Sequence, residues 1–569
     1  MEKITSLREI MKEYGIGAYV IPSTDEWRNE YTPLHKKRLE WICGFSGSNG
    51  VLIVTEKDLI LFTDGRYTLQ ARIELGDSYT IVDMYNPSGC DAMAYCKGLI
   101  VGYDPMIQTL SEIEYYEKLG KRLGYSMQSV EDNLVDILMG NTKNISNVKT
   151  LPLEITGMST EDKIKAIIEK IPAECDYLVL TSLASICWLL NIRGNDIPYN
   201  PMVLCYMILE IKTKKIHLFV NTSKLLNIND VTIYDLDSFK NHVKGLKSSK
   251  IAFDKKNSPI WLTHNIENGI DVEDPAVMLK AMKNPVELEG FRKAHRYDGV
   301  ALCKFWFWFY ENLEIGFDEV SAAERLTEFR RENLSFVEEN FSTISGYGSN
   351  GAIVHYGPKK GFCKAIPSPG EDPIYLVDSG GHYDCAGTTD ITRMFDLGGA
   401  TDEHKTCYTA VLKGHIALAN AVFPEGTAGS HLDALARYYL WQIGLDYSHG
   451  TGHGVGHFLS VHEGPQGITK RNNVPLRENM IVSIEPGYYK EGHFGMRIEN
   501  LYAIKKSSKF PGFLEFDLLS MVPIETSLID YNKMTQDEIT WLQTHNRVAL
   551  EAVKSKLTHE ELEFVSSRS

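Results

Sequence analysis

The chain lacks a cysteine framework. Its ten cysteines are scattered through 569 residues, and no two of them form a CxxC pair. Paired or regularly spaced cysteines would indicate a zinc ribbon or a disulfide scaffold. Their scatter instead predicts reduced thiols, most of them buried in a core. A small disulfide-stapled fold and a cysteine-ligated zinc site are therefore not expected.

Positive charge and long apolar runs are also scarce. The 59 lysines and arginines stand against 75 aspartates and glutamates, and the formal net charge is −16. Binding nucleic acid without regard to its sequence requires basic patches, so no nucleic-acid partner is expected. The longest apolar stretch, residues 177–192, is too short and too mixed to span a bilayer. The charged start MEKITSLREIMKEYG has no apolar secretory core. The sequence therefore predicts a cytoplasmic protein with no membrane partner.

The order of helix-like and strand-like segments divides the chain into three parts. Residues 1–142 combine a helix over Leu7–Tyr14 with short apolar strands, and residues 143–278 repeat that plan. The polar stretch GNTKNISNVKT marks the first boundary, and a long helical run from Asn284 opens the last part, residues 279–569. The sequence predicts an α/β (α+β) protein in which two similar α/β domains precede a larger third domain.

Four acidic residues and one histidine stand beside apolar or glycine-rich runs in the last part. They are Asp378 in IYLVDSGG, Asp390 in GTTDITR, His453 in HGTGHGVGH, Glu485 in MIVSIEPGYY and Glu499 in GMRIENLYAI. A lone Asp after a strand is usually a turn former, but four such carboxylates would be costly to bury unless they were neutralised. Four carboxylates and one imidazole suit a pair of divalent ions better than a lone zinc ion. Two such ions can hold a bridging hydroxide and polarise a carbonyl, which is metal-assisted hydrolysis.

The acids fall into two similar hairpins. Each has an apolar strand, an acid, a turn of glycine and aromatic residues, and a second acid on the following strand. The acids are twelve residues apart in the first pair and fourteen in the second. Alternation along antiparallel strands carries both acids of a pair to one side, so two facing hairpins would surround a two-ion centre. The glycines around His453 exclude a stable helix and allow backbone to approach a metal or substrate closely.

Two further histidines end apolar runs at Gly-Pro turns. They are His355 in NGAIVHYGP and His462 in SVHEGP. That placing is expected of a side chain aimed into a cleft, although the pattern fits a packed or surface histidine equally well. The TDGRY turn at Asp64–Tyr67, taken by itself, indicates only the exit of a hairpin.

Taken together, these strings resemble the aminopeptidase P family of metallopeptidases. The resemblance rests on VDSGGHY, GTTDITR, GHGVGHFLSVHEGP, SIEPGYY and RIEN, with FTDGRY in the first part and WLLNIRGNDIPYNP in the second. It covers essentially the whole chain and implies two creatinase-like α/β domains, followed by a pita-bread catalytic domain with a C-terminal extension. It also implies hydrolysis of the N-terminal Xaa-Pro bond of short peptides. The implied enzyme is a cytoplasmic homodimer that uses two divalent ions, manganese first, with zinc and cobalt as alternatives.

The resemblance also assigns roles at the predicted metal site. It implies metal ligands at Asp378, Asp390, His453, Glu485 and Glu499. Glu485 would also be the general base that takes a proton from the bridging water. Arg497, two residues before Glu499, would orient a ligand carboxylate from the second layer.

Other matching positions are implied to face the substrate. His355 and His462 would contact the peptide and stabilise the tetrahedral intermediate, and His453 would border the same site. Arg66 in TDGRY would reach the far end of the peptide. His457 departs from the pattern, because a small residue is expected there. It is either a surface histidine without a role or a histidine that alters the pH behaviour near the metals, and we favour the surface histidine.

Two alternative functions stay open. Prolidase shares the catalytic fold but cleaves only Xaa-Pro dipeptides. A non-catalytic pita-bread module would bind peptides and would have lost metal ligands, whereas all five are present here. Methionine aminopeptidase fits less well, because it normally lacks both upstream domains. Metal content separates the binding module from the enzymes.

Overall fold

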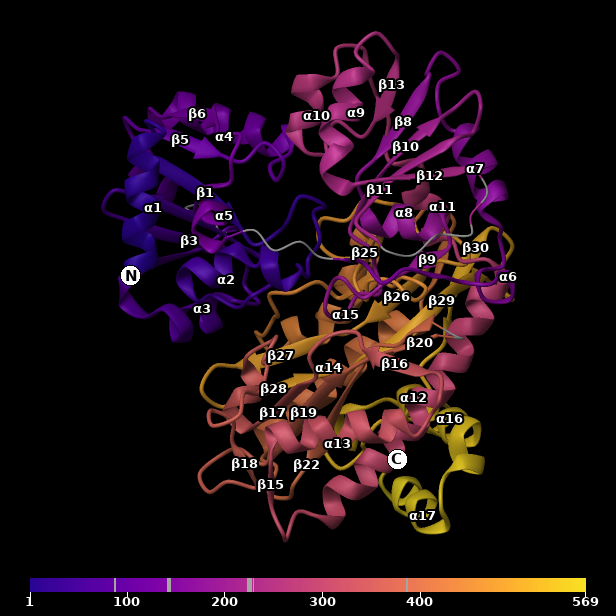
Figure 1. Cartoon of the computed structure of the whole chain (residues 1–569). Helices are drawn as coiled ribbons and strands as arrows, with labels where there is room; N and C mark the ends of the chain where they lie inside the picture. Colours follow the sequence, from indigo (N-terminus) through magenta and orange to yellow (C-terminus); the bar gives the residue numbers. More distant parts are fainter. Residues whose placement is uncertain (86–88, 141–144, 223–227, 229, 385–386) are drawn as a thin grey trace. The chain divides into compact units, whose positions relative to one another are not determined.

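The computed structural model describes residues 1–85, 89–140, 145–222, 228, 230–384 and 387–569. Its contacts divide the chain into two compact units. The first comprises Met1–Pro152 and Met158–Ala276, and the second comprises Leu153–Gly157 and Val277–Ser569. Figure 1 shows the elements of both units. The predicted linker at 140–150 lies partly outside the described residues, and the limits of the three expected domains stay a prediction.

The first unit contains two six-stranded sheets with the same strand order. One has the order β4-β3-β2-β1-β5-β6, formed by β1 (Ala18–Pro22), β2 (Gly50–Thr55), β3 (Leu59–Thr63), β4 (Thr80–Asp83), β5 (Ile100–Tyr103) and β6 (Ser126–Ser129). The other has the order β12-β11-β10-β8-β13-β14, formed by β8 (Tyr177–Leu180), β10 (Cys205–Glu210), β11 (Ile216–Val220), β12 (Val231–Tyr234), β13 (Ile251–Phe253) and β14 (Gly269–Asp271). Corresponding strand pairs also run in the same relative directions. The prediction that the second part repeats the plan of the first is confirmed.

The central strand of the first sheet is apolar throughout because helices cover both of its faces. Along β1, Tyr19 and Ile21 belong to the core completed by α1 (Glu2–Glu13) and α5 (Leu134–Met139). Ala18 and Val20 alternate with them and belong to the core beside α4 (Leu110–Leu123). Helix α1 begins at Glu2, five residues before the predicted start, since its buried side chains at positions 4, 7 and 11 share one helical face.

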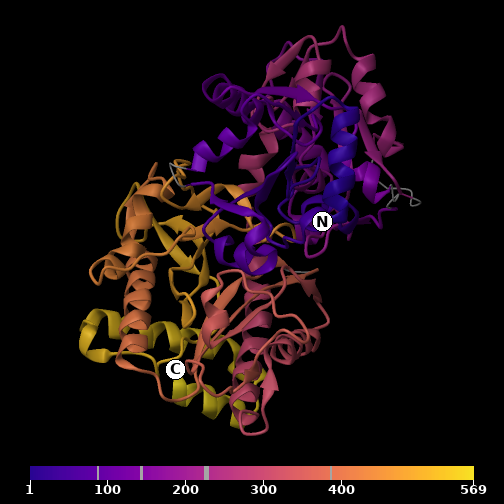
Figure 2. The same ribbon diagram turned by 90° about the vertical axis from the view of Figure 1, so that its left-hand side faces the viewer.

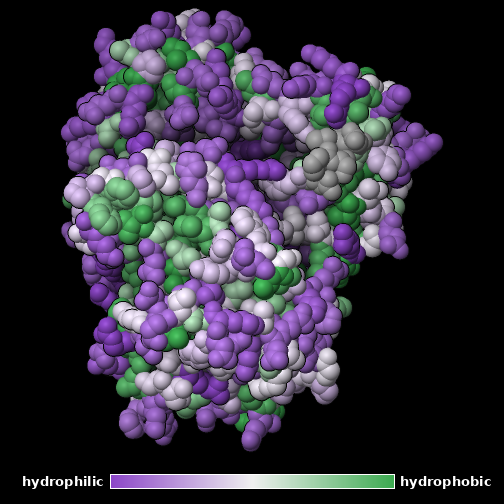
Figure 3. All heavy atoms as spheres, turned by 180° about the vertical axis from the view of Figure 1, so that it is seen from behind, coloured by the Kyte–Doolittle hydropathy of each residue, from purple (hydrophilic) through white to green (hydrophobic). Residues whose placement is uncertain are grey.

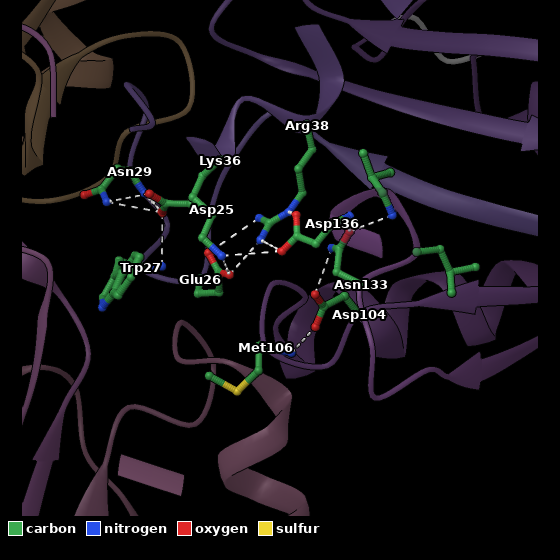
Figure 4. A network of polar contacts seen from close by, with 12 residues as sticks. Asp25, Glu26, Trp27, Asn29, Lys36, Arg38, Asp104, Met106, Asn133 and Asp136 are labelled. Carbon is green, nitrogen blue, oxygen red and sulfur yellow. Dashed lines mark hydrogen bonds and ion pairs between the residues drawn. The ribbon is translucent and has the colours of Figure 1, made fainter. Parts of the chain in front are cut away.

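A buried network of charges fixes the segment 23–37, which follows β1 (Figure 4). Arg38 is 1 % exposed and donates to Asp136 at 2.6 Å and to Glu26 at 2.7 Å. Lys36 also contacts Glu26, with 2.7 Å between its Nζ and Oε1. Removing one partner of a buried pair leaves an uncompensated charge, so the network holds this segment in one path.

Two of the sheets in the second unit each have a hairpin inserted between two of their strands. Strands β17 (Ile344–Tyr347), β19 (Ile374–Ser379) and β22 (Ile391–Asp396) form one sheet, and β23 (Val422–Pro424), β30 (Phe513–Leu518), β29 (Asn500–Lys506) and β26 (Ile481–Ile484) form the other. The hairpin of β20 (Gly381–Tyr383) and β21 (Gly387–Thr388) falls between β19 and β22 in the chain. The hairpin of β27 (Gly487–Lys490) and β28 (Phe494–Arg497) falls between β26 and β29. The repeated arrangement of strand, turn and strand is therefore present in both halves.

Long helices cover the outer faces of these sheets (Figures 1 and 2). They are α12 (Pro285–Glu311), α13 (Glu319–Arg331), α14 (Asp402–Ala419) and α15 (Gly429–Trp441). Tyr375 of β19 packs against Phe309 of α12, with 4.5 Å between ring centroids, whereas its neighbour Leu376 joins the core beside α14. The C-terminal helices α16 (Gln536–Val553) and α17 (His559–Arg568) pack on α12. The Asn284 side chain caps the start of helix α12. Its Nδ2 also donates a hydrogen bond to Thr156 O, in the segment 153–157, at 2.8 Å.

Within the described residues, none of the helices combines the length and the apolarity that crossing a membrane requires.

Candidate metal centre

The first pair of acids lies at the end of the sheet formed by β17, β19 and β22. Asp378 on β19 stands opposite Thr392 on β22, and Asp390 directly precedes that strand. Since side chains alternate along a strand, Asp390 and Thr392 share the face that Asp378 occupies. Both carboxylates are buried. The prediction that both acids of this hairpin lie on one side is confirmed.

The second pair of acids lies across the neighbouring sheet. Glu485 follows β26 and Glu499 precedes β29, and Ile484 stands opposite Asn500 in that pair of strands. The two pairs of acids meet where Glu499 Oε2 accepts a hydrogen bond from Thr392 Oγ1, on the strand that follows Asp390, at 2.8 Å. The two hairpins therefore face each other, as their symmetry predicts.

His453 brings the imidazole to this cluster. Its Nε2 lies 3.4 Å from Asp390 Oδ2 and 3.6 Å from Glu485 Oε1. It sits in the short strand β24 (Gly452–Gly454), so the prediction of a non-helical segment is confirmed. A Cβ on Gly452 would lie 1.9 Å from Ser483 O, and one on Gly454 would lie 2.2 Å from Glu463 O. The glycines thus let β24 lie against neighbouring strands, and their close approach to a metal or substrate stays a prediction.

The electrostatics of the cluster favour a bound cation. Burial raises the pKa of Asp378 to about 7, although the Arg497 guanidinium opposes the shift. Burial and the neighbouring carboxylates likewise raise the pKa of Glu499. Burial raises the pKa of Glu485, while the His453 charge opposes it. Burial by itself would lower the pKa of His453, but its hydrogen bond with Asp390 and the charges of both acids raise it to about 9. More negative charge is buried here than the neighbouring side chains neutralise.

The donor atoms also fit divalent ions. Asp390, His453 and Glu499 each offer a ligand atom, and these atoms all lie within 4.8 Å of one another. Asp378 Oδ1 and Glu499 Oε1 are buried without a hydrogen-bond partner among the described residues. Buried carboxylate oxygens normally find a partner, so these two are positioned for a ligand that the protein itself does not supply. Carboxylates with one imidazole suit ions of intermediate hardness.

Arg497 links the two halves of the site. Its Nη2 donates to Asp378 Oδ2 at 2.6 Å, and its Nε donates to Thr392 Oγ1 at 3.1 Å. Its Nη1 donates to Tyr489 Oη at 2.5 Å, and that oxygen lies 2.9 Å from His449 Nε2. The arginine thus orients one acid directly and a second acid through the threonine. The sequence interpretation missed Thr392 and Tyr489, although Thr392 could have been found by the two-residue alternation from Asp390.

His355 lies beside the arginine that serves the acids. It follows the short helix η5 (Gly348–Ala352), and the carbonyl of its neighbour Val354 accepts a hydrogen bond from Arg497 Nη2 at 3.5 Å. Its backbone is therefore tied to the same guanidinium that holds Asp378.

His462 lies directly against His453, with ring centroids 4.3 Å apart and planes at 82°. The next residue, Glu463, begins β25 (Glu463–Ile468) and is held by Lys283 at 2.6 Å and Lys280 at 3.1 Å. All three residues of that buried contact belong to the second unit. The structure therefore brings His462 to the acidic cluster and anchors its chain neighbour.

His457 is not a surface residue, and that expectation is wrong. The side chain is buried, and its residue is only 2 % exposed. Its ring lies 5.6 Å from the Phe291 ring of α12. The glycine-rich string has the pattern of an exposed turn, but α12 covers it, and the sequence carried no local signal of that covering helix.

Arg66 belongs to the first unit. Its Nε and Nη2 bind the two carboxylate oxygens of Asp64 at 2.9 and 2.8 Å, and its Nη1 lies 3.9 Å from Glu30 Oε1. The guanidinium also lies over the Tyr67 ring, 5.1 Å from its centroid. Asp64 therefore binds the Nε and Nη2 edge of the guanidinium, whereas Nη1 lies only at ion-pair distance from Glu30 and can donate to a further acceptor. Its role toward a peptide stays a prediction.

Family models match nearly the whole chain. The creatinase/prolidase N-terminal domain matches residues 3–139, and a second model of that domain matches residues 141–287. Metallopeptidase family M24 matches residues 289–506, and the C-terminal region of peptidase M24 matches residues 512–567. The fold and the acidic site define a metallopeptidase with two creatinase-like N-terminal domains and a pita-bread catalytic domain.

Full-length relatives narrow this class. The chain is 39 % identical to the probable Xaa-Pro aminopeptidase P of Laccaria bicolor, over 96 % of this chain and 89 % of that one. It is 36 % identical to Xaa-Pro aminopeptidase 1 of Dictyostelium discoideum, over 96 % and 91 %. The crystal structure of X-prolyl aminopeptidase from Caenorhabditis elegans, described as a cytosolic enzyme with a di-nuclear active site, superposes with a TM-score of 0.93 at 32 % identity. That match covers 100 % of this chain and 98 % of the other. The chain belongs to the Xaa-Pro aminopeptidase family.

Proposed function

We propose that the protein removes the first residue of short peptides by hydrolysing an N-terminal Xaa-Pro bond. The observation that carries the proposal is the cluster of four carboxylates and His453 in a chain that is similar to Xaa-Pro aminopeptidases over most of their length. Asp378, Asp390, His453, Glu485 and Glu499 are the proposed ligands of two divalent ions, and manganese is the proposed metal. The proposed domains are residues 1–142, 143–278 and 279–569.

The chemistry follows from what proline removes. An Xaa-Pro bond is a tertiary amide without an N–H, so an enzyme cannot grip that group. When bound, the two ions supply Lewis acidity and lower the pKa of a water molecule toward neutrality. Glu485 accepts the proton of the attacking water, and Arg497 keeps the Asp378 carboxylate oriented. His355 and His462 donate hydrogen bonds to the oxygen on which negative charge develops.

A cleavage panel tests the proposal and separates it from its alternatives. Xaa-Pro dipeptides, Xaa-Pro-Yaa and Xaa-Ala-Yaa tripeptides are incubated with the chain after reconstitution with manganese, cobalt or zinc. We expect cleavage of Xaa-Pro-Yaa, with the highest rate in manganese. Cleavage of the dipeptide only would identify a prolidase. No cleavage and no bound metal would identify a peptide-binding module.

We predict that His355→Ala and His462→Ala lower kcat far more than they lower metal content. Both imidazoles act on the substrate and the intermediate, so the ions should remain when either is lost. Removing one such donor typically costs about 10²–10³-fold in kcat. Steady-state kinetics and elemental analysis of the same samples check this. A metal-free variant would make that histidine a ligand instead.

We predict that Arg66→Ala raises KM for tri- to pentapeptides, with smaller changes in kcat and metal content. Nη1 is the edge that Asp64 leaves available, and it can hold a peptide carbonyl or carboxylate by directed hydrogen bonds that lysine reproduces poorly. Kinetics on a peptide-length series measure the effect. Equal KM values for mutant and wild type at every length would reduce Arg66 to a structural partner of Asp64.

A cytoplasmic homodimer is the proposed assembly. Helix α15 exposes a stripe of apolar side chains, with Leu435 38 %, Tyr438 51 % and Trp441 45 % exposed, and apolar patches are also visible on the face in Figure 3. Large side chains of this kind on one helical face are typical of an interface. Light scattering tests the assembly, and a molar mass near the 64.3 kDa of one chain would contradict it.

A further inference from the structure

The loop that carries His355 is organised around one buried carboxylate. Glu319 is the first residue of α13 and is 0 % exposed. Strand β17, helix η5 and the segment up to residue 364 supply the donors that surround it. No motif in the sequence singles out Glu319, and the proposed chemistry gives it no part.

Both oxygens of Glu319 are fully used. Oε1 accepts from Tyr347 N at 2.7 Å and from Asn350 Nδ2 at 3.1 Å. Oε2 accepts from Asn350 Nδ2 at 2.9 Å, Tyr356 Oη at 2.7 Å and Lys364 N at 2.8 Å. Every one of these donors is uncharged, so the carboxylate is stabilised by neutral hydrogen bonds and not by an ion pair. A carboxylate at the start of a helix is also favoured by the helix dipole.

The balance of forces at Glu319 depends on those donors. Burial raises the pKa of Glu319, while the hydrogen bonds from Tyr347, Lys364, Tyr356 and Asn350 oppose that rise. Burying the Glu319 carboxylate without these donors would cost free energy of folding. The loop and the carboxylate therefore stabilise each other's placement.

His355 lies between two anchors. The first is Glu319, which accepts hydrogen bonds from Tyr356, the residue after His355, and from Asn350, five residues before it. The second is Arg497, which donates a hydrogen bond to the carbonyl of Val354, the residue before His355, and also to Asp378. The metal-site arginine and the distant carboxylate thus fix the backbone immediately before and after His355.

We propose that Glu319 is a positioning residue that sets the place of His355 relative to the acidic cluster. It acts through Tyr356 and Asn350 and touches neither substrate nor metal. The inference rests on the proposed function, because His355 needs precise placement only if it meets a reacting peptide.

The first test is Glu319→Gln. A carboxamide keeps the shape, but its NH₂ group would face at least two donors in place of acceptor oxygen. A displacement of about 1 Å in a catalytic group can cost about 10²-fold, so we expect kcat/KM on Xaa-Pro-Yaa to fall by about that factor. Metal content should stay at the wild-type value, since none of the ligands contacts Glu319.

Glu525→Gln is the matched control. Glu525 is equally buried in the second unit and collects donors from Trp306, Tyr310, Ser527 and Arg568. Its replacement should lower the melting temperature as much as Glu319→Gln does, but leave kcat/KM within about twofold of the wild type. Equal activity losses in the two variants would reduce Glu319 to a structural residue.

A double-mutant cycle with His355→Ala decides whether Glu319 acts through that histidine. If it does, Glu319→Gln should change kcat/KM by less than about twofold once His355 is absent. Losses that multiply would overturn the inference. If Glu319→Gln does not fold, Tyr356→Phe replaces it in the cycle, with the same expectation of non-additive losses. No turnover by the unaltered chain would overturn the proposed function, whereas multiplying losses in an active enzyme would overturn only the role of Glu319.

Discussion

Replacing Glu485 with glutamine is expected to abolish peptide turnover while the fold persists. The carboxamide keeps the shape of the side chain but does not accept the proton of the attacking water. Loss of a general base typically costs about 10²–10⁴-fold in rate. Glu485 Oε1 lies 3.6 Å from His453 Nε2, so the proposed general base is itself part of the acidic cluster. Kinetics after metal reconstitution, with circular dichroism for the fold, measure the effect.

The control for Glu485→Gln is Glu478→Gln. Glu478 is an exposed acid of the same unit and pairs with Lys506 at 3.5 Å, so its loss should leave the rate unchanged. Near wild-type activity in Glu485→Gln would remove this residue from the mechanism. An inactive variant that had also lost both ions would limit Glu485 to the role of a ligand.

Replacing Arg497 with methionine is expected to weaken metal binding by about 10–100-fold and to lower kcat with it. Methionine fills much of the same volume but supplies none of the hydrogen bonds to Asp378, Thr392 and Tyr489. Asp378 would then be a buried carboxylate without its cation, which favours its protonated form over its metal-binding form. Calorimetric titration of the metal-free chain with manganese measures the affinity.

Two variants bracket the Arg497→Met result. Arg497→Lys keeps the charge but loses the planar fork, so its affinity should fall between those of the wild type and Arg497→Met. Arg292→Met removes a half-buried arginine that pairs with Asp517 at 3.2 Å, far from the acidic cluster in sequence, and it should leave metal affinity unchanged. Unchanged affinity in Arg497→Met would show that Asp378 is oriented without the guanidinium.

Much of the acidic site could be predicted from the sequence because its geometry is local. Asp378 lies on β19 and Asp390 directly precedes the adjacent antiparallel strand β22, where a period of two decides which side chains share a face. Glu485 and Glu499 follow the same rule across β26 and β29. The apolar runs before them predict burial, and buried acids in such numbers predict a cation. The similar succession of helices and strands in the two halves of the first unit is also visible in the alternation of apolar segments.

The residues that sequence reasoning missed depend on contacts that are distant along the chain. Glu319 precedes the donors that surround it by 28 to 45 residues, so no periodicity connects them. His457 was misjudged because the string around it carries no sign of the residue that covers it, and Phe291 does so from more than 160 positions earlier in the chain. Patterns within one element predict its exposed and buried faces, but they do not predict which other element covers it.

The assignment of residues 153–157 to the second unit has a consequence for protein engineering. This short segment meets the start of α12, where Asn284 Nδ2 donates to Thr156 O and a Cβ on Gly157 would lie 2.4 Å from Asn284 Oδ1. A fragment that begins at Val277 would carry every proposed ligand but would lack the turn that packs on its first long helix. The gene therefore contains no single uninterrupted stretch that encodes the catalytic unit alone. An autonomous miniature enzyme would need those five residues grafted ahead of α12 through a new linker.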